Sequence, residues 1–213
     1  MNIIQLIGVY TETLTFLVSL FTFHKYRHTV LKYLPLFLGL TAGLEFFCLY
    51  FYKAGNVWLY NIRTIIEFNF YAFIFWHYLN RFNRKLLFAF LVVFNSVTIL
   101  NFVFGIQKFL LEPISYIYTL SYFLLVLIII ILFNQILRSE TPLEGILGNL
   151  LIWFSFGSLI YYGTCLPLFS ISNWVDVMGD LGQQLINILF FAVEIMNALF
   201  IIGFICSKKT YTY

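Results

Sequence analysis

Charged residues are scarce in this sequence, and so are cysteine, histidine and proline. Lysine, arginine, aspartate and glutamate make up 10% of the 213 residues, while 62% are hydrophobic. A typical soluble domain carries about a quarter charged residues. A chain of this size has too high a ratio of surface to volume to hide so much apolar surface from water. The scarcity of charge therefore excludes a water-soluble globule and indicates a protein solvated by lipid.

Other absences exclude further classes of protein. The three cysteines, Cys48, Cys165 and Cys206, lie far apart without paired spacing, which argues against a disulfide framework or a thiolate metal site. The net charge of +3 comes without a basic run, so we expect no nucleic-acid partner. The sequence also lacks a glycine-rich phosphate loop, a nucleophile elbow and a redox motif. We therefore predict no catalytic residues and no cofactor, and do not expect an enzyme.

Seven apolar runs are each long enough to cross a hydrocarbon core, which takes about 20 residues. They predict an all-α, polytopic transmembrane bundle that forms a single domain over residues 1–213. Pro167 is expected to end the sixth helix. The predicted helices span residues 3–22, 33–53, 57–79, 86–104, 114–136, 146–166 and 184–206.

The basic residues predict the orientation of this bundle. Nine of them fall in the first, third and fifth connections and the C-terminal tail, and two, Lys53 and Lys108, fall on the other side. Cytoplasmic loops carry an excess of lysine and arginine. We therefore expect the N-terminus outside, the C-terminus in the cytoplasm, and a multi-pass protein of the inner cell membrane.

Two predicted helices differ in polarity. The fifth contains LLVLIIIILF, apolar all round, so we expect it to face outward, toward lipid or a partner subunit. The first carries one polar stripe along a helical face. Polar groups that face lipid are costly, so this stripe should face the bundle interior. Its members are Gln5, Gly8, Glu12, Thr15, Ser19 and Thr22.

Four glutamates lie near the middle of predicted helices one, two, three and seven. Each ionised group placed there costs about 2.5–3.5 kcal/mol. Each glutamate is within two residues of its helix midpoint, which is roughly 3 Å of depth. If the helices close in sequence order, these four helices are neighbours and the side chains converge on one site. The four residues are Glu12, Glu45, Glu67 and Glu194.

Other polar residues extend this layer. Arg63 lies one turn from Glu67, so an ion pair along the third helix is an option. Four carboxylates and one guanidinium carry three excess negative charges, so we expect either protonated glutamates or a bound cation. A structural polar network that orders helix packing remains the competing interpretation. The further supporting residues are Asn95, Ser158, Asn187 and Asn197.

The three histidines are weak candidates for a metal site. His24 and His28 are four residues apart at the inner end of the first helix, and His77 ends the third. An i,i+4 pair with a third histidine can bind zinc. Because the pair flanks a loop and no HExxH motif accompanies it, a position at the membrane interface beside Lys25 and Arg27 is favoured.

The whole layout resembles small, uncharacterised seven-helix bacterial inner-membrane proteins. It includes an early glutamate in YTETLTF, a basic HKYRHT connection and an IIGFICSKKTYTY ending. The topology is also similar to that of rhodopsins and receptors, but the last helix has no lysine for retinal. Intramembrane ceramidase-like hydrolases need histidine ligands on membrane helices, and the last helix has none.

Three functions are left open by the sequence. The first is a glutamate cluster that binds a cation or protons for transport, conduction or sensing. The second is a sensor or interaction protein that acts through a signalling partner at its basic cytoplasmic face, or as a homo-oligomer, with the glutamates as structural groups. The third is a metal-dependent lipid hydrolase within the membrane. For each of these functions we expect the protein to be embedded in the lipid bilayer.

Overall fold

The computed structural model describes residues 3–51, 56–138, 148–171 and 179–208. Across these ranges all regular structure is helical, in agreement with the predicted all-α class. Two short 3₁₀ helices, Phe23–Lys25 and Val30–Tyr33, connect the first two α-helices. The seven α-helices are α1 (Ile3–Phe21), α2 (Leu34–Tyr50), α3 (Val57–Trp76), α4 (Arg81–Phe104), α5 (Ser115–Leu137), α7 (Leu150–Ile171) and α8 (Asp180–Cys206).

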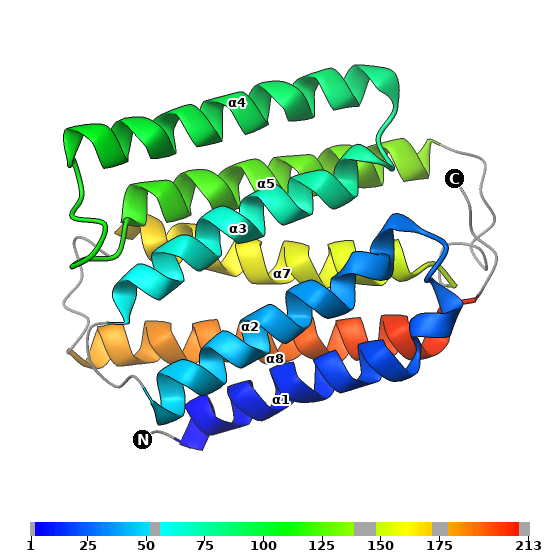
Figure 1. Ribbon diagram of the computed structural model, residues 1–213, viewed down its shortest axis with the longest axis horizontal. Coiled ribbons are helices and arrows are strands. Elements are labelled where there is room, and N and C mark those ends of the chain that lie inside the picture. The colour runs from blue at the N-terminus through cyan, green and yellow to red at the C-terminus, as the bar shows by residue number, and fades with distance from the viewer. Residues whose placement is uncertain (1–2, 52–55, 139–147, 172–178, 209–213) are drawn as a thin grey trace.

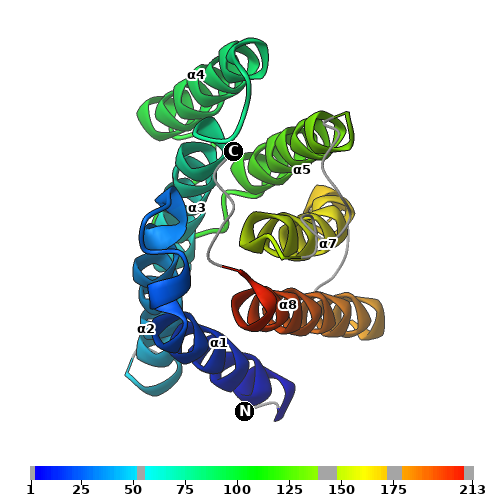
Figure 2. The ribbon, with the colours of Figure 1, turned by 90° about the vertical axis from the view of Figure 1, so that its right-hand side faces the viewer.

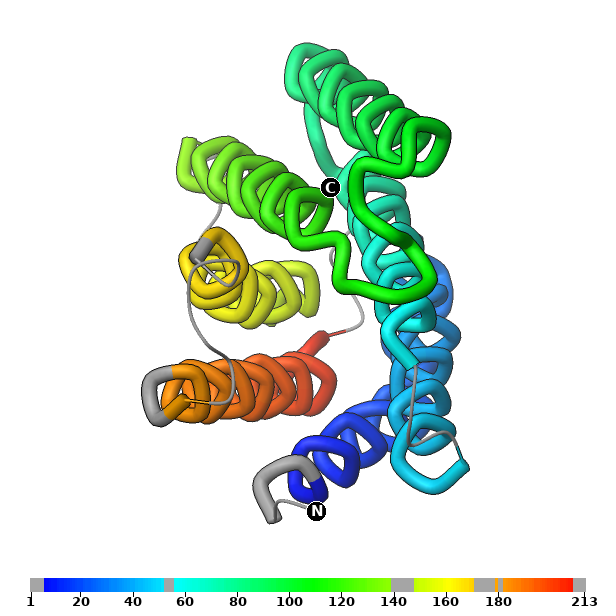
Figure 3. Tube along the Cα trace, turned by 90° about the vertical axis from the view of Figure 1, so that its left-hand side faces the viewer, coloured from blue at the N-terminus to red at the C-terminus, as the bar shows by residue number. Residues whose placement is uncertain are grey.

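Six of these helices form a ring, and α4 lies outside it. Helix α1 packs between α2 and α8, α8 packs on α7, and α7 packs on α5. Helix α3 closes the ring by contacting both α2 and α5, as the two views along the bundle show (Figures 2 and 3). Consecutive helices run in alternating directions along the long axis (Figure 1). The predicted order of neighbours therefore holds, with the last helix beside the first, the first beside the second and the second beside the third, but the ring omits the fourth.

The prediction that the fifth helix faces outward is wrong. Helix α5 contacts α3, α4 and α7, and its buried residues include Leu125, Ile128 and Ile129. Helix α4 is the peripheral one, because it packs only against α3 and α5 among the helices with substantial contacts (Figure 2). An apolar sequence fits lipid and a membrane-protein core equally well, so the composition of α5 could not separate the two environments.

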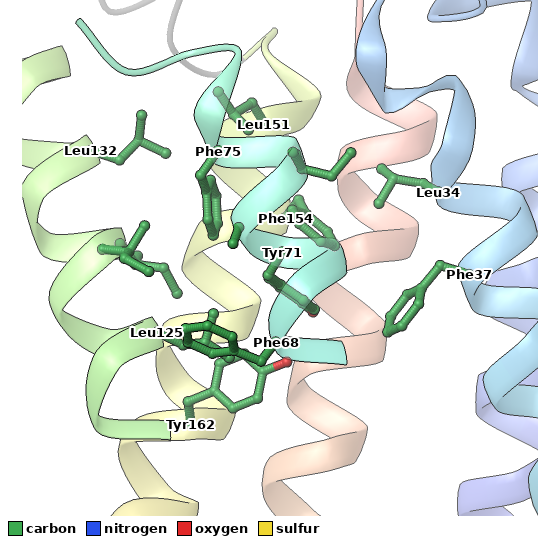
Figure 4. Packing of buried hydrophobic residues seen from close by; sticks show 14 of the residues in the cluster. Leu34, Phe37, Phe68, Tyr71, Phe75, Leu125, Leu132, Leu151, Phe154 and Tyr162 are labelled. Atoms are coloured by element: carbon green, nitrogen blue, oxygen red, sulfur yellow. The ribbon is translucent and has the colours of Figure 1, made fainter. Parts of the chain in front are cut away.

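Aromatic side chains fill the space between α3 and α7. The rings of Tyr71 and Phe154 stack with centroids 4.9 Å apart, and Tyr162 meets Tyr71 edge to face at 5.4 Å (Figure 4). Phe37 reaches the same cluster from α2, 5.9 Å from Tyr71. Such offset and edge-to-face pairs are favourable beyond simple burial. The cluster thus packs α2, α3 and α7 against one another.

Glycines allow the close contact of α7 with α8. A Cβ atom at Gly203 would lie 2.6 Å from Cβ of Trp153, and one at Gly157 would lie 3.1 Å from the backbone oxygen of Met196. Both distances are shorter than ordinary van der Waals contact. Small residues at membrane helix interfaces let two backbones approach in this way.

Five helices are long and apolar enough to cross a membrane. They are Val30–Tyr50, Arg81–Phe104, Ser115–Leu137, Leu150–Ser170 and Gly182–Cys206. The described helices thus have the lengths and composition of a membrane protein. The remaining two of the predicted seven spans are α1, whose apolar stretch Leu6–Phe21 is shorter, and α3, which carries many polar residues.

Several helix ends differ from the predicted ones. Helix α4 begins at Arg81 rather than 86, because the Asn80 side chain accepts a hydrogen bond from the backbone of Asn83 and caps the helix. Pro167 does not end α7, which continues for one more turn to Ile171. The predicted ends at residues 53 and 146, with Lys53 and Lys209, lie outside the described residues.

Candidate functional site

Arg63 of α3 connects three helices through its guanidinium. Its Nη1 atom forms a hydrogen-bonded ion pair with Oε1 of Glu45 on α2, and its Nη2 atom lies 3.7 Å from Oε1 of Glu12 on α1. These pairs cross between helices, whereas the sequence suggested a pair with Glu67 along α3. The guanidinium therefore compensates two carboxylates from two other helices.

Tyr60 completes the environment of Glu45. It lies one turn before Arg63 on α3, and its hydroxyl donates a hydrogen bond of 3.0 Å to the second carboxylate oxygen, Oε2. Helix spacing places residues i and i+3 on one face, so α3 presents a charge and a hydroxyl to the same partner. Each carboxylate oxygen of Glu45 therefore accepts a hydrogen bond from a side chain of α3.

Glu67 lies deeper, between α3 and α7. Its side chain belongs to a residue only 7% exposed, and its Oε1 atom accepts a hydrogen bond of 2.6 Å from the fully buried Tyr162 hydroxyl. Ser158, one turn earlier on α7, hydrogen-bonds the Tyr71 hydroxyl over 3.1 Å. These contacts extend the polar layer from the carboxylates into the aromatic cluster of Figure 4.

Glu194 of α8 reaches the layer from the opposite wall of the ring. Its Oε1 atom accepts a hydrogen bond of 3.0 Å from the Thr11 hydroxyl on α1. Gly8, one turn before Glu12, leaves room for this carboxylate, since a Cβ atom there would lie 3.7 Å from the same oxygen. From Gly8 onward the polar stripe of α1 thus faces the interior, where Thr15 and Ser19 are fully buried, while the side chain of Gln5 lies outside the described part of the chain.

Glu12 occupies the centre of the four glutamates. It interacts electrostatically with Arg63 and with each of the other three carboxylates. Its side chain is 11% exposed, and its Oε2 atom is buried without a hydrogen-bond partner among the described residues. Carboxylates from four helices thus meet in one layer, two of them pair with the Arg63 guanidinium, and one oxygen of Glu12 is left able to accept a proton or a ligand.

The supporting residues named from the sequence fall into two groups. Ser158 lies in the layer, next to Tyr71. Asn95 lies apart from it, because it hydrogen-bonds Asn69 at the outer contact of α4 with α3. Asn197 is buried but donates to the Val193 carbonyl of its own helix, and Asn187 is exposed.

The histidines do not form a metal site in the described part of the chain. His24, His28 and His77 are exposed, and a ring nitrogen of His77 contacts the carbonyl of Phe73 on its own helix. No three histidine, cysteine, aspartate or glutamate side chains within the described ranges are placed to hold one metal ion. This statement includes the four glutamates of the layer.

The fold and this layer define an all-helical bundle of membrane type with a buried, carboxylate-rich interior. Comparison with known proteins finds no matching protein family, no matching characterised protein and no matching solved structure. The interpretation of the layer therefore depends on its own chemistry.

Three residues whose hydroxyl groups bond the glutamates were not predicted from the sequence: Thr11, Tyr60 and Tyr162. Tyr162 gave a usable signal, because it lies in the middle of a membrane helix rather than at an interface, where tyrosines of membrane proteins gather. A buried tyrosine hydroxyl usually finds a hydrogen-bond partner. Thr11 and Tyr60 gave no comparable signal, since their partners depend on how α1 meets α8 and how α3 meets α2.

Proposed function

We propose that this protein crosses the membrane with seven helices and binds protons at the glutamate layer, as part of proton transport, conduction or sensing. The observation that carries the proposal is the gathering of Glu45, Glu67 and Glu194 around Glu12, which itself pairs with Arg63. Ionisable residues within membrane helices usually belong to ion, proton or ligand pathways.

The seven-helix topology draws support from the position of α1 and α3 in the ring. Helices of 19 and 20 residues are about 28–30 Å long, close to the thickness of the hydrocarbon core. The polar residues that lower the apolarity of α3, among them Asn61, Thr64 and Glu67, are buried inside the bundle. Their polarity is therefore shielded from lipid.

The orientation draws support from the charges at the two ends. The end of the bundle that holds the α1–α2 connection, the start of α4 and the end of α8 carries Lys25, Arg27, Lys32, Arg81, Arg84, Lys85 and Lys208. We assign this end to the cytoplasm, which places the N-terminus outside.

Protons suit the layer better than a metal ion for two reasons. The described carboxylates do not offer three ligands to one ion, and hydroxyl groups already occupy one oxygen each of Glu45, Glu67 and Glu194. A single guanidinium cannot neutralise four carboxylates that are buried or partly buried, and burial disfavours the uncompensated charges. Two or three protons held in the layer would offset this excess of negative charge. The loss or gain of a single proton would then change the net charge of the layer.

The experiment is proton flux into vesicles reconstituted with the purified protein and loaded with a pH-sensitive dye. Glu12→Gln should abolish flux, because Glu12 is the carboxylate that interacts with all the others. Glu112→Gln is the matched control, since Glu112 is exposed and lies in the α4–α5 connection, where it accepts a hydrogen bond from the Lys108 backbone. Flux that survives in the glutamine variants at positions 12, 45, 67 and 194 would end the proposal.

Thermal stability of the same variants separates a proton site from a purely structural network. Glutamine keeps an oxygen that can accept the Tyr162 or Thr11 hydrogen bond while removing the buried negative charge. An uncompensated buried charge is unfavourable, so removing a glutamate charge that exceeds what Arg63 can compensate should not destabilise the fold. A proton site therefore predicts lost flux with unchanged or higher stability. The interaction-protein alternative predicts wild-type vesicles without flux and glutamine variants that unfold more easily.

A further inference from the structure

A small hollow lies at the basic end of the bundle, where four separate parts of the chain meet, one of them at Tyr78 just after α3. The α1–α2 connection contributes Lys25 and His28, the start of α7 contributes Asn149, and the residues after α8 contribute Lys208. The enclosed space is about 20 Å³, which is roughly the room needed by one water-sized group.

Asn149 is one of the residues that line this hollow, and it leaves a side-chain hydrogen-bond donor unused. Its side-chain oxygen caps α7 by accepting a hydrogen bond of 2.9 Å from the backbone of Leu151. Its amide nitrogen, Nδ2, is buried without a partner, and the residue is 6% exposed. Leaving a buried donor unpaired is unfavourable. An acceptor supplied from outside the chain would satisfy it.

Positive charge surrounds this donor. The first turn of α7 presents the positive end of a 22-residue helix, where anions bind readily. The Lys25 ammonium is held close by, because it donates to the carbonyl of Ile205 at 2.6 Å and to that of Phe204 at 3.3 Å. The backbone of Lys208 donates to Gly148 at 3.0 Å, which anchors this lysine beside the start of α7. No carboxylate is among the described residues that line the hollow.

We propose that the hollow binds the oxyanion of a phosphate group. One anionic oxygen enters the hollow and accepts from Nδ2 of Asn149, while the rest of the phosphate stays at the mouth with Lys25, His28 and Lys208. Two sources share this chemistry, the headgroup of an anionic phospholipid and free phosphate. The position at the end of the bundle, level with lipid headgroups, favours the phospholipid.

The test is thermal unfolding of the full-length protein in a neutral detergent, titrated with three probes. These are short-chain phosphatidylglycerol, short-chain phosphatidylcholine and inorganic phosphate. A ligand that binds the folded state raises the unfolding midpoint as its concentration rises. We expect phosphatidylglycerol to raise it at lower concentration than phosphatidylcholine.

Asn149→Asp should abolish this response. Aspartate keeps the oxygen that caps α7 and so preserves the helix start, but it replaces the free donor by a repelling carboxylate. Lys208→Gln, an exposed position, should weaken the response about tenfold, as expected for one hydrogen bond to a charged group. Lys85→Gln is the control, because Lys85 is exposed at the same end and does not line the hollow.

Each outcome decides the proposal. A response to phosphatidylglycerol, or to inorganic phosphate alone, that is lost in Asn149→Asp and kept in Lys85→Gln supports the site and identifies the source. If none of the probes shifts the midpoint, the hollow holds water only and the proposal is wrong. It is also wrong if Lys85→Gln and Lys208→Gln weaken the response equally, since general attraction to a basic surface would then explain it.

Discussion

Helices α3 and α4 follow one another in the chain, but the polar α3 is the more buried of the two, whereas the apolar α4 is the more exposed. Helix α3 carries Asn61, Arg63, Thr64, Glu67 and Asn69, yet eight of its 20 residues are buried. Helix α4 has a mean hydropathy of 2.3 over its most apolar window, yet only 17% of that window is buried. The more polar helix is the inner one.

This contrast reverses the rule for water-soluble proteins, in which apolar residues lie inside. Lipid tails are as apolar as leucine, so an apolar helix gains little by leaving them. A polar helix gains much, because its hydrogen-bonding groups find partners only within the protein. In this bundle a polar helix is therefore a buried one. A uniformly apolar helix can lie inside, as α5 does, or at the periphery, as α4 does.

The largest expected effect comes from removing the charge at the centre of α3. Arg63→Met keeps most of the side-chain bulk but leaves Glu12 and Glu45 without their cation. Breaking a buried ion pair in this way costs about 3–5 kcal/mol, measured as the loss in free energy of unfolding of the purified protein. Lys85→Met, at the exposed start of α4, should change stability by less than about 0.5 kcal/mol.

A second substitution sharpens the Arg63 result. Glu45→Gln in the Arg63→Met background removes one of the stranded charges, so it should recover part of the lost stability. Lack of any recovery would mean that Arg63 acts by packing rather than by charge, and the electrostatic account of the layer would be wrong.

A smaller effect is expected where α4 touches α3. The fully buried Phe94 of α4 packs on Phe68 of α3 with ring centroids 4.0 Å apart, whereas Phe88 is 58% exposed. Phenylalanine-to-alanine changes in soluble cores cost about 3–5 kcal/mol. Here the transfer from water is absent, so Phe94→Ala should cost about 2 kcal/mol, through lost packing and the cavity left behind.

Phe88→Ala gives the matched comparison on the same helix. It should leave the unfolding midpoint unchanged in detergent, because that ring contacts lipid rather than protein. Equal destabilisation by the two substitutions would place Phe88 in a protein contact, such as a second copy of the chain, and would contradict the lipid-facing position of α4.

The sequence predicted helix positions well and helix neighbours less well. Long apolar runs located all seven α-helices, with ends that moved by up to five residues where Asn80 caps α4 or where α7 passes through Pro167. The exclusion of α4 from the ring could not be predicted, because its residues suit lipid and protein alike. The seven crossings and their orientation stay predictions.

For the glutamate layer, the sequence indicated depth but not partners. Placing Glu12, Glu45, Glu67 and Glu194 near helix centres needed only the rise per residue. Their bonds depend on helix rotation, which decides that Arg63 meets α1 and α2 rather than Glu67. The hydroxyls of Tyr60 and Tyr162 are determined in the same way. Whether the layer binds protons stays a proposal.

The smallest expected effect concerns the polar contact between α3 and α4. The amides of Asn69 and Asn95 hydrogen-bond each other at 3.1 and 3.3 Å, and each also donates to a carbonyl of its own helix. Hydrogen bonds between membrane helices average about 0.6 kcal/mol, because the separated helices also find partners for their polar groups. Asn95→Leu should therefore lower the unfolding free energy by about this amount.

A double-substitution cycle with Asn69→Leu measures the contact itself. The two single changes and the double change should cost nearly the same, since each removes the same pair. Thr98→Val on α4 is the control, because the Thr98 hydroxyl donates to the Phe94 carbonyl of its own helix. If the two changes were additive, the asparagines would act independently, and α4 would be held to α3 by ring packing alone. The polar residues of α3 would then order the ring interior without contributing to its outer contact.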